Sequence, residues 1–213
     1  FCSNLQKMTK KERAKIVMTE LEKIYPEVPI PLNHKNAYEL LVAVALSAQT
    51  TDKKVNEVTP KLFSVAPNPQ KMAILEESEI KELIKEIGLS TTKAKNLKLM
   101  ANQLLERHNG EVPANFEDLE NLAGVGHKTA SVVMSQAFGF PAFPVDTHIH
   151  RLMKQWKLTE GKNVVQTEND AKKLFPKETW NKLHLQIIFY GREYSPARGN
   201  QERDYITKIL FEG

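Results

Sequence analysis

The segment LAGVGHKTASVV, residues 122–133, contains a lysine two positions after a Gly-x-Gly turn. Gly124 and Gly126 form this turn, and the apolar spacing after it predicts a helix whose first turn carries Lys128. Glycine permits positive φ and a close approach of the backbone to a ligand, while the free amides at a helix start attract anions. The pattern fits a phosphate site, and it also fits an ordinary corner between two helices.

Lys128 is unusual because a helix N-terminus, like burial, disfavours a cation and favours the neutral amine. A neutral amine is a nucleophile that can form a Schiff base, whereas a charged one would point to solvent or contact a phosphate. The residues alone leave both roles open. A nucleotide-binding phosphate loop is excluded, because that motif needs glycine where His127 stands and follows a strand, whereas the residues before this turn predict a helix.

The segment PVDTHIHR, residues 144–151, contains Asp146, which lies eighteen residues after Lys128. Asp146 precedes a predicted helix and fits an N-cap position, where it is stabilised as an anion. An ionised carboxylate beside a neutral amine can also stabilise positive charge on a sugar or transfer a proton. On a strand, Asp146, His148 and His150 would share a face and could bind a metal, but a helix separates them. We therefore expect His148 to pack or to hydrogen-bond near the site.

Apolar residues at helical spacing predict an all-α protein, with little strand alternation. Ser78 is predicted to cap the helix at 79–87, and Gly88 to end it. The helix at 36–47 is apolar on nearly every face, so we expect it at the centre of a core. The other expected helices span residues 10–25, 51–66, 69–75, 90–108, 116–122, 127–138, 147–156, 167–175 and 179–192.

The chain has 213 residues, enough for one large domain or two small ones, with a net charge of +4 and a pI of about 9.0. This mild basicity fits a polyanionic partner without establishing one. Cys2 is the only cysteine, which excludes an internal disulfide and any cysteine-based metal site. The apolar runs are too short to span a membrane, and we expect a cytoplasmic, nucleoid-associated protein.

Several of these segments together resemble one known family. The hairpin LAGVGHKTASVV and the following AFGFPAFPVDTHIHRL are similar to the helix-hairpin-helix and the aspartate of the endonuclease III DNA glycosylases. The upstream segments LLVAVALSAQTTDKKVN and IKEIGLSTTKAKNL also match, so the resemblance extends from about Tyr38 to Arg192. The combination is specific, although each segment alone is weak.

The resemblance implies a six-helix barrel domain with the hairpin at residues 30–140, and a second helical domain made of residues 1–29 and 141–213, with DNA in the cleft between. It implies a base-excision-repair glycosylase with AP lyase activity that removes damaged bases, typically oxidised pyrimidines, from double-stranded DNA. By matching position, Lys128 is the amine that attacks C1′ of the sugar, and Asp146 is the essential carboxylate. We expect a monomer. A glycosylase of the same fold for alkylated or mismatched bases, and a non-catalytic DNA-binding module, are the alternatives.

The same matching assigns contacts with DNA. Gln49 would fill the space left by the extruded base, and Leu89 would be the apolar wedge that offsets the cost of unstacking. From the residues alone, Gln49 could instead cap carbonyls, and Leu89 could be the apolar contact of a glycine helix cap. The hairpin would hold backbone phosphates, often with a monovalent cation on its carbonyls. The complete DNA-contacting set is Gln49, Leu89, Gly124, Val125, Gly126, His127, Thr129 and His148.

Most members of this family end in four cysteines that bind a [4Fe-4S] cluster, and this chain departs from them. The corresponding positions hold Ser195, Glu202, Tyr205 and Phe211, none of which supplies a thiolate. We therefore expect no iron–sulfur cluster. The apolar residues within 205–211 fall close to helical spacing and are expected to replace the cluster with an apolar patch.

Overall fold

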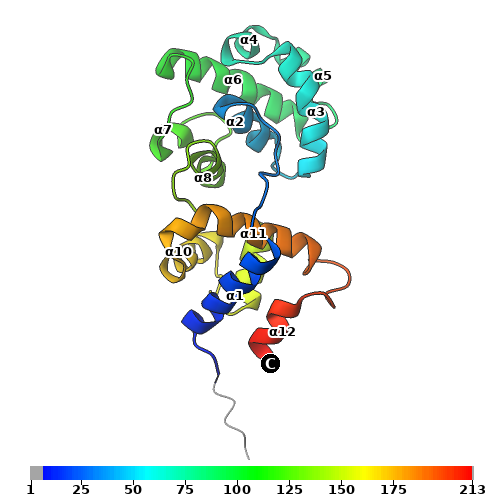
Figure 1. Cartoon of the computed structure of the whole chain (residues 1–213). Coiled ribbons are helices and arrows are strands. Elements are labelled where there is room, and N and C mark those ends of the chain that lie inside the picture. The colour runs from blue at the N-terminus through cyan, green and yellow to red at the C-terminus, as the bar shows by residue number, and fades with distance from the viewer. Residues whose placement is uncertain (1–6, 213) are drawn as a thin grey trace, which may run out of the picture. The chain divides into compact units, whose positions relative to one another are not determined.

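The computed structural model describes residues 7–212, so Cys2 lies outside the described part of the chain. Helices account for all the regular structure within these residues, which confirms the all-α prediction. The chain divides into two compact units (Figure 1), which we call the central unit, Ile30–Phe140, and the terminal unit, Phe1–Pro29 with Pro141–Gly213. Within residues 7–212, every helix is too short or too polar to cross a membrane.

The central unit is built around α2 (Ala37–Leu46), whose side chains are almost all buried, as predicted from its lack of a polar face. It contacts α3 (Asp52–Val65), α6 (Ser90–His108) and α8 (His127–Gln136) (Figure 1). Helix α2 and its neighbours share one apolar core. The remaining helices of the unit are α4 (Pro69–Ile74), α5 (Glu77–Leu83) and α7 (Phe116–Glu120).

The terminal unit has a second, separate core that joins the two ends of the chain. Helix α11 (Trp180–Glu193) contacts α1 (Lys10–Ile24) and α9 (Thr147–Gln155), and α1 also contacts α12 (Tyr205–Phe211). Trp156, Tyr190 and Phe143 are the largest fully buried side chains of this core. The unit is completed by α10 (Val164–Leu174) and a short 3-10 helix, η1 (Lys177–Thr179).

Most helices begin at a short polar side chain that satisfies a backbone N–H which the helix leaves without a partner. Two of the predicted starts are wrong. Helix α5 begins at Glu77 rather than after Ser78, with Glu79 accepting from the Glu76 amide at 3.1 Å. Helix α10 begins at Val164, one turn before the predicted start, because the preceding asparagine caps it. The capping residues are Thr9, Asn36, Thr51, Asn68, Asn115, Asp146, Asn163 and Asp204.

The core of the terminal unit contains a histidine, His184, on α11. Its Nδ1 lies 2.9 Å from the Trp180 carbonyl and therefore donates to it, while Nε2 is buried without a partner. The ring makes an edge contact with Phe143, at 6.3 Å between centroids. Burial disfavours the imidazolium and lowers the pKa of His184 to about 4.

Acid should therefore destabilise the protein through His184. Because the folded-state pKa of His184, about 4, lies below the unfolded value of about 6.5, its contribution is present above pH ~6.5 and is lost as pH falls toward 4. We expect a loss of roughly 3 kcal/mol in unfolding free energy over this window. Urea unfolding of native protein and His184→Asn, at a series of pH values, measures it. The substitution should flatten the curve, and parallel curves would contradict the assignment.

Candidate active site

The turn between α7 and α8 depends on one of its two glycines for its shape. Gly124 has φ +76, in the left-handed region, and a Cβ added to it would lie 3.2 Å from Asn96 on α6. Gly126 has an ordinary φ of −96, so the expectation of positive φ applies to Gly124 alone. A Cβ added to Gly126 would meet nothing within 4 Å. The first glycine therefore shapes the turn, and the second leaves open space at the start of α8.

The start of α8 has no side-chain cap. Gly126 occupies the N-cap position, and its carbonyl accepts the first helical hydrogen bond from Ala130 at 3.0 Å. Lys128, on the first turn, is exposed, so the partial burial considered for it is not found. Thr129 is half-buried, and the Val125 side chain lies in the core, so Val125 can reach a ligand only through its backbone. The turn thus presents main-chain groups and one exposed amine.

The His127 side chain is held by the hairpin itself. Its ring stacks on Phe116 of α7 with 5.7 Å between centroids, and its Nδ1 lies 3.1 Å from the Glu120 carboxylate. On the other side, its Nε2 lies 3.5 Å from Ser131 Oγ. The contacts with Phe116 and Glu120 join α7 to α8 through the imidazole.

Asp146 begins α9 in the terminal unit and acts as the predicted N-cap. Its Oδ1 accepts from the Ile149 amide at 2.7 Å. The residues just before it, 142–145, are buried and anchor the start of the helix. Asp146 itself is half-buried, so its carboxylate is oriented by one hydrogen bond while part of it reaches solvent. Lys128 belongs to the central unit and Asp146 to the terminal unit.

His148 lies in the first turn of α9 and is half-buried within the terminal unit. Its side chain lies against Gly191 of α11, where an added Cβ would come within 2.9 Å of the His148 Cβ. Its Nδ1 lies 3.1 Å from Arg151 Nη2, which also donates to the Ser195 carbonyl at 2.6 Å. Burial lowers the pKa of His148. His150 instead pairs with Thr167 at 2.8 Å, so the two histidines have different partners.

Gln49 and Leu89 lie in neighbouring loops of the central unit, and both have left-handed backbones, with φ +58 and +61. An L-residue is strained in this conformation, and such strain concentrates at functional sites. Leu89 is 56% exposed and directly precedes α6, whereas α5 ends at Leu83, so Leu89 is not the contact of a glycine cap. A Cβ added to Gly88 would lie 4.0 Å from the Gln49 carbonyl. The two loops are therefore adjacent.

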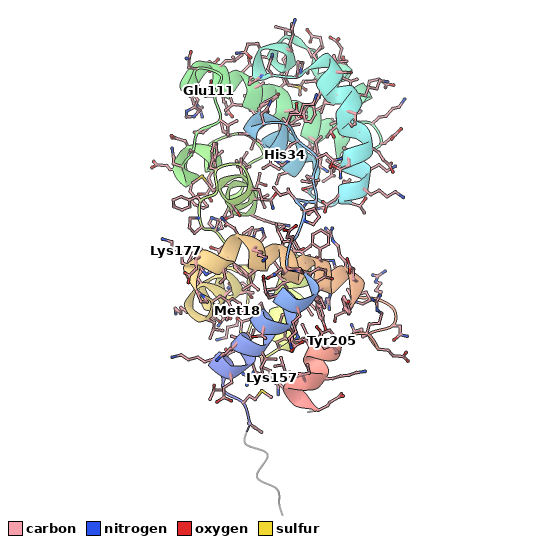
Figure 2. All side chains as sticks on the ribbon, in the orientation of Figure 1. Met18, His34, Glu111, Lys157, Lys177 and Tyr205 are labelled. Atoms are coloured by element: carbon pink, nitrogen blue, oxygen red, sulfur yellow. The ribbon has the colours of Figure 1, made fainter. Side chains whose placement is uncertain are left out.

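The four positions that correspond to cluster cysteines have unlike surroundings. Ser195 is buried, and Glu202 is exposed. The Tyr205 ring packs edge-on against Tyr194 at 6.0 Å. Phe211 is 42% exposed, and the Nζ of Lys157, labelled with Tyr205 in Figure 2, lies 5.1 Å from its centroid. The predicted apolar patch is thus only partly correct, since Ile206 and Leu210 are buried but Phe211 is not.

Sequence reasoning missed the residue that organises this region, the buried Asp204. Its carboxylate accepts from Tyr190 Oη at 2.5 Å, Ser195 Oγ at 2.8 Å and Gln155 Nε2 at 2.8 Å. Thr207 donates to it through both the hydroxyl and the amide, which caps α12. Its position before an apolar helix was the available signal, because aspartate is a preferred N-cap.

Residues 42–177 match the family model of the HhH-GPD superfamily base excision DNA repair proteins. Over 205 residues the chain is 45% identical to Endonuclease III of Haemophilus influenzae, which covers 96% of this chain and 97% of the relative. Endonuclease III of Escherichia coli K12 is 44% identical over the same shares of the two chains.

Solved structures of endonuclease III proteins also match this chain. One, of a trapped Endonuclease III–DNA covalent intermediate, matches with a TM-score of 0.88 and 39% identity, over 91% of this chain and 92% of that one. Another, of a non-covalent Endonuclease III–DNA complex, matches with a TM-score of 0.89 and 36% identity, over 97% and 100%. The fold of the described chain is therefore the endonuclease III fold.

The two hairpin glycines should respond differently to alanine. Gly124→Ala should lower the unfolding free energy by about 1–2 kcal/mol, because a Cβ is strained at positive φ and crowds Asn96. Gly126→Ala should change it by less than ~0.5 kcal/mol, since its backbone is extended and its surroundings are open. Denaturant unfolding of both variants measures this, and equal losses would contradict the distinction.

Proposed function

The chain belongs to the HhH-GPD superfamily of base excision DNA repair proteins, and we propose that Lys128 is its nucleophile and Asp146 its essential carboxylate. It is a DNA glycosylase with AP lyase activity of the endonuclease III type. The position of Lys128 supports its role as the nucleophile. Its amine is exposed on the first turn of α8, beside an uncapped turn that leaves room for a ligand.

The proposed reaction begins with a base flipped out of the duplex, since the sugar C1′ is not accessible in the stack. The neutral Nζ of Lys128 attacks C1′ and the C1′–N bond breaks, so that the base departs with the bonding electrons and takes up a proton. The sugar ring opens to a Schiff base between Nζ and C1′. Loss of a C2′ proton then eliminates the 3′ phosphate, which cuts the strand.

Asp146 has a different part in this scheme. Its hydrogen bond to the Ile149 amide holds one oxygen at the start of α9, where the helix dipole favours an anion. The other oxygen is available to stabilise positive charge developing on the sugar or to transfer the proton that moves when the ring opens. We assign Asp146 to this role because it is the only carboxylate of the segment 129–150 that follows the lysine.

The chain binds DNA, and we propose that its substrate is damaged duplex DNA. The amides of the hairpin, from Gly124 to Thr129, would hold backbone phosphates without reading the sequence, aided by a monovalent cation on the carbonyls. Gln49 and Leu89 would enter the base stack, and His148 would support the start of α9.

We infer a monomer that acts on oxidised pyrimidines in nucleoid DNA. Excision rates on duplexes with oxidised, alkylated or mismatched bases separate this from the alternative substrates.

An iron–sulfur cluster, which the family implies, does not fit the residues of this chain. None of Ser195, Glu202, Tyr205 and Phe211 is a thiolate, and the Ser195 hydroxyl is already committed to Asp204 at 2.8 Å. We propose that the hydrogen bonds to Asp204 hold this region instead, and no step of the reaction uses a cluster.

Purified protein should accordingly contain no stoichiometric iron or acid-labile sulfide, and it should show no absorption band from a cluster. Asp204→Asn should lower the unfolding temperature by several degrees, because an amide NH₂ would face the donors that now point at a carboxylate oxygen. Iron analysis and thermal unfolding are the measurements. Iron and sulfide at one cluster per chain would contradict the proposal.

Borohydride trapping tests the nucleophile directly, because it reduces the Schiff base to a stable amine. Native protein should form a covalent adduct with duplex DNA carrying a damaged pyrimidine or an abasic site. Lys128→Ala should abolish the adduct, while Asp146→Asn should slow its formation by roughly 100-fold or more with DNA binding largely kept.

Lys173→Ala, an exposed lysine near the end of α10, is the control and should trap as the native protein does. An adduct that persists in Lys128→Ala would reject Lys128 as the nucleophile. Tight DNA binding by the native protein without any excision or trapping would favour the non-catalytic alternative.

A further inference from the structure

A buried lysine on α6, Lys93, connects the two loops to which we have assigned entry into the base stack. Lys93 is only 7% exposed, although lysine is rarely buried without a partner. Its Nζ donates to the Leu46 carbonyl at 3.0 Å, to the Ala48 carbonyl at 2.6 Å and to Thr50 Oγ1 at 3.3 Å. All three acceptors lie at the end of α2 or in the loop after it.

These contacts suit the charge of Lys93. A helix leaves its last carbonyls without backbone partners, and the helix dipole makes this end negative, so a cation is favoured there. The acceptors Ala48 and Thr50 flank Gln49, whose left-handed backbone would otherwise relax to a more favourable conformation. Burial lowers the pKa of Lys93, and the three acceptors account for its retention in the core.

The backbone of the same residue contacts the other loop. The Lys93 amide donates to the Leu89 carbonyl at 2.9 Å, which is the first hydrogen bond of α6. Leu89, like Gln49, is an exposed residue with a left-handed backbone. A single residue therefore bonds to the loop of Gln49 through its side chain and to Leu89 through its main chain.

We propose that Lys93 is a positioning residue that locks the Gln49 and Leu89 loops to each other, so that both side chains enter the DNA as one preformed unit. This inference rests on the proposed function, because it takes Gln49 and Leu89 as the inserted side chains. Lys93 does not touch the reacting atoms. Its loss would separate the two loops and weaken base flipping, while leaving the chemistry at Lys128 intact.

The test replaces Lys93 with methionine, which keeps the unbranched stem and removes the charged donor. Lys93→Met should excise a damaged base from duplex DNA at least about tenfold more slowly in single turnover. On an abasic site in single-stranded DNA, which needs no flipping, it should retain strand cleavage to within about threefold. Equal losses on the two substrates would overturn the inference, because they indicate a general structural role.

A double-mutant cycle with Leu89→Ala tests whether Lys93 acts through the position of Leu89. If Lys93 acts by holding Leu89 in register with Gln49, the double variant should be little slower than the slower single variant on duplex DNA. Additive losses would overturn the inference. Lys98→Met is the matched control: this lysine lies on the same helix, and its Nζ also donates to a carbonyl, that of Leu75 at 2.5 Å, away from both loops. It should show no selective loss on duplex DNA.

A binding measurement separates this inference from the proposed function. A duplex with 2-aminopurine opposite an abasic analogue reports unstacking by fluorescence without requiring any reaction. Native protein should unstack the probe, and Lys93→Met should do so to a smaller extent at saturating protein. Unstacking without cleavage by the native protein would reject the proposed chemistry and leave the role of Lys93 standing. Equal unstacking by the native protein and Lys93→Met would reject the role of Lys93.

Discussion

Every helix end leaves backbone groups that need partners, and the way each end is satisfied determines what this protein can do at its surface. Where a side chain closes the first turn, as Asn36 and Asn163 do, the helix end is complete and needs no ligand. Helices α6 and α8 have Leu89 and Gly126 at their N-cap positions instead, and no side chain caps either helix. Both helix starts lie in segments to which we assign contacts with DNA. The missing caps lower the stability of the isolated protein, and they leave backbone amides available to phosphates. The negative end of α2 is satisfied from within by the Lys93 side chain, which donates to the Leu46 and Ala48 carbonyls.

In the C-terminal region, a buried carboxylate provides the hydrogen-bond acceptor that several helices share. In relatives with four cysteines, a cluster would join positions of one short segment, which corresponds to residues 195–211 here. Here Asp204 accepts from Gln155, Tyr190 and Ser195, so it joins the end of α9, α11 and the start of α12 through hydrogen bonds. A charged acceptor strengthens such bonds, and a saturated network avoids the penalty of an unpartnered buried group. The network also borders Arg151, which bonds to both the Ser195 carbonyl and His148. The region without the four cysteines therefore contacts the helix that Asp146 begins.

The sequence predicts most of the fold because the helices of this protein follow a regular apolar spacing. Helix α2 is the clearest case, since its lack of a polar face placed it in the core. The errors lie at helix ends, where local capping decides. Glu76 and Asn163 cap α5 and α10 before the predicted starts, and α5 ends at Leu83 rather than at the predicted Gly88. For the site, spacing and resemblance could indicate Lys128, Asp146, Gln49 and Leu89. They could not indicate Lys93 or Asp204, because the partners of both are distant in sequence and a buried charge leaves no periodic pattern.

The two cores differ in how much of the chain must be synthesised before each core can fold. The central unit is continuous, so all its helices are available once residue 140 has been synthesised. The terminal unit is not, because α1 must wait for α11 and α12 to supply the other side of its core. Since domains fold as units during synthesis, the hairpin with its lysine can mature on the ribosome while the segment of Asp146 is still unfolded. On the roles proposed above, the nascent chain completes its DNA-contacting hairpin and nucleophile before the segment of the essential carboxylate can fold.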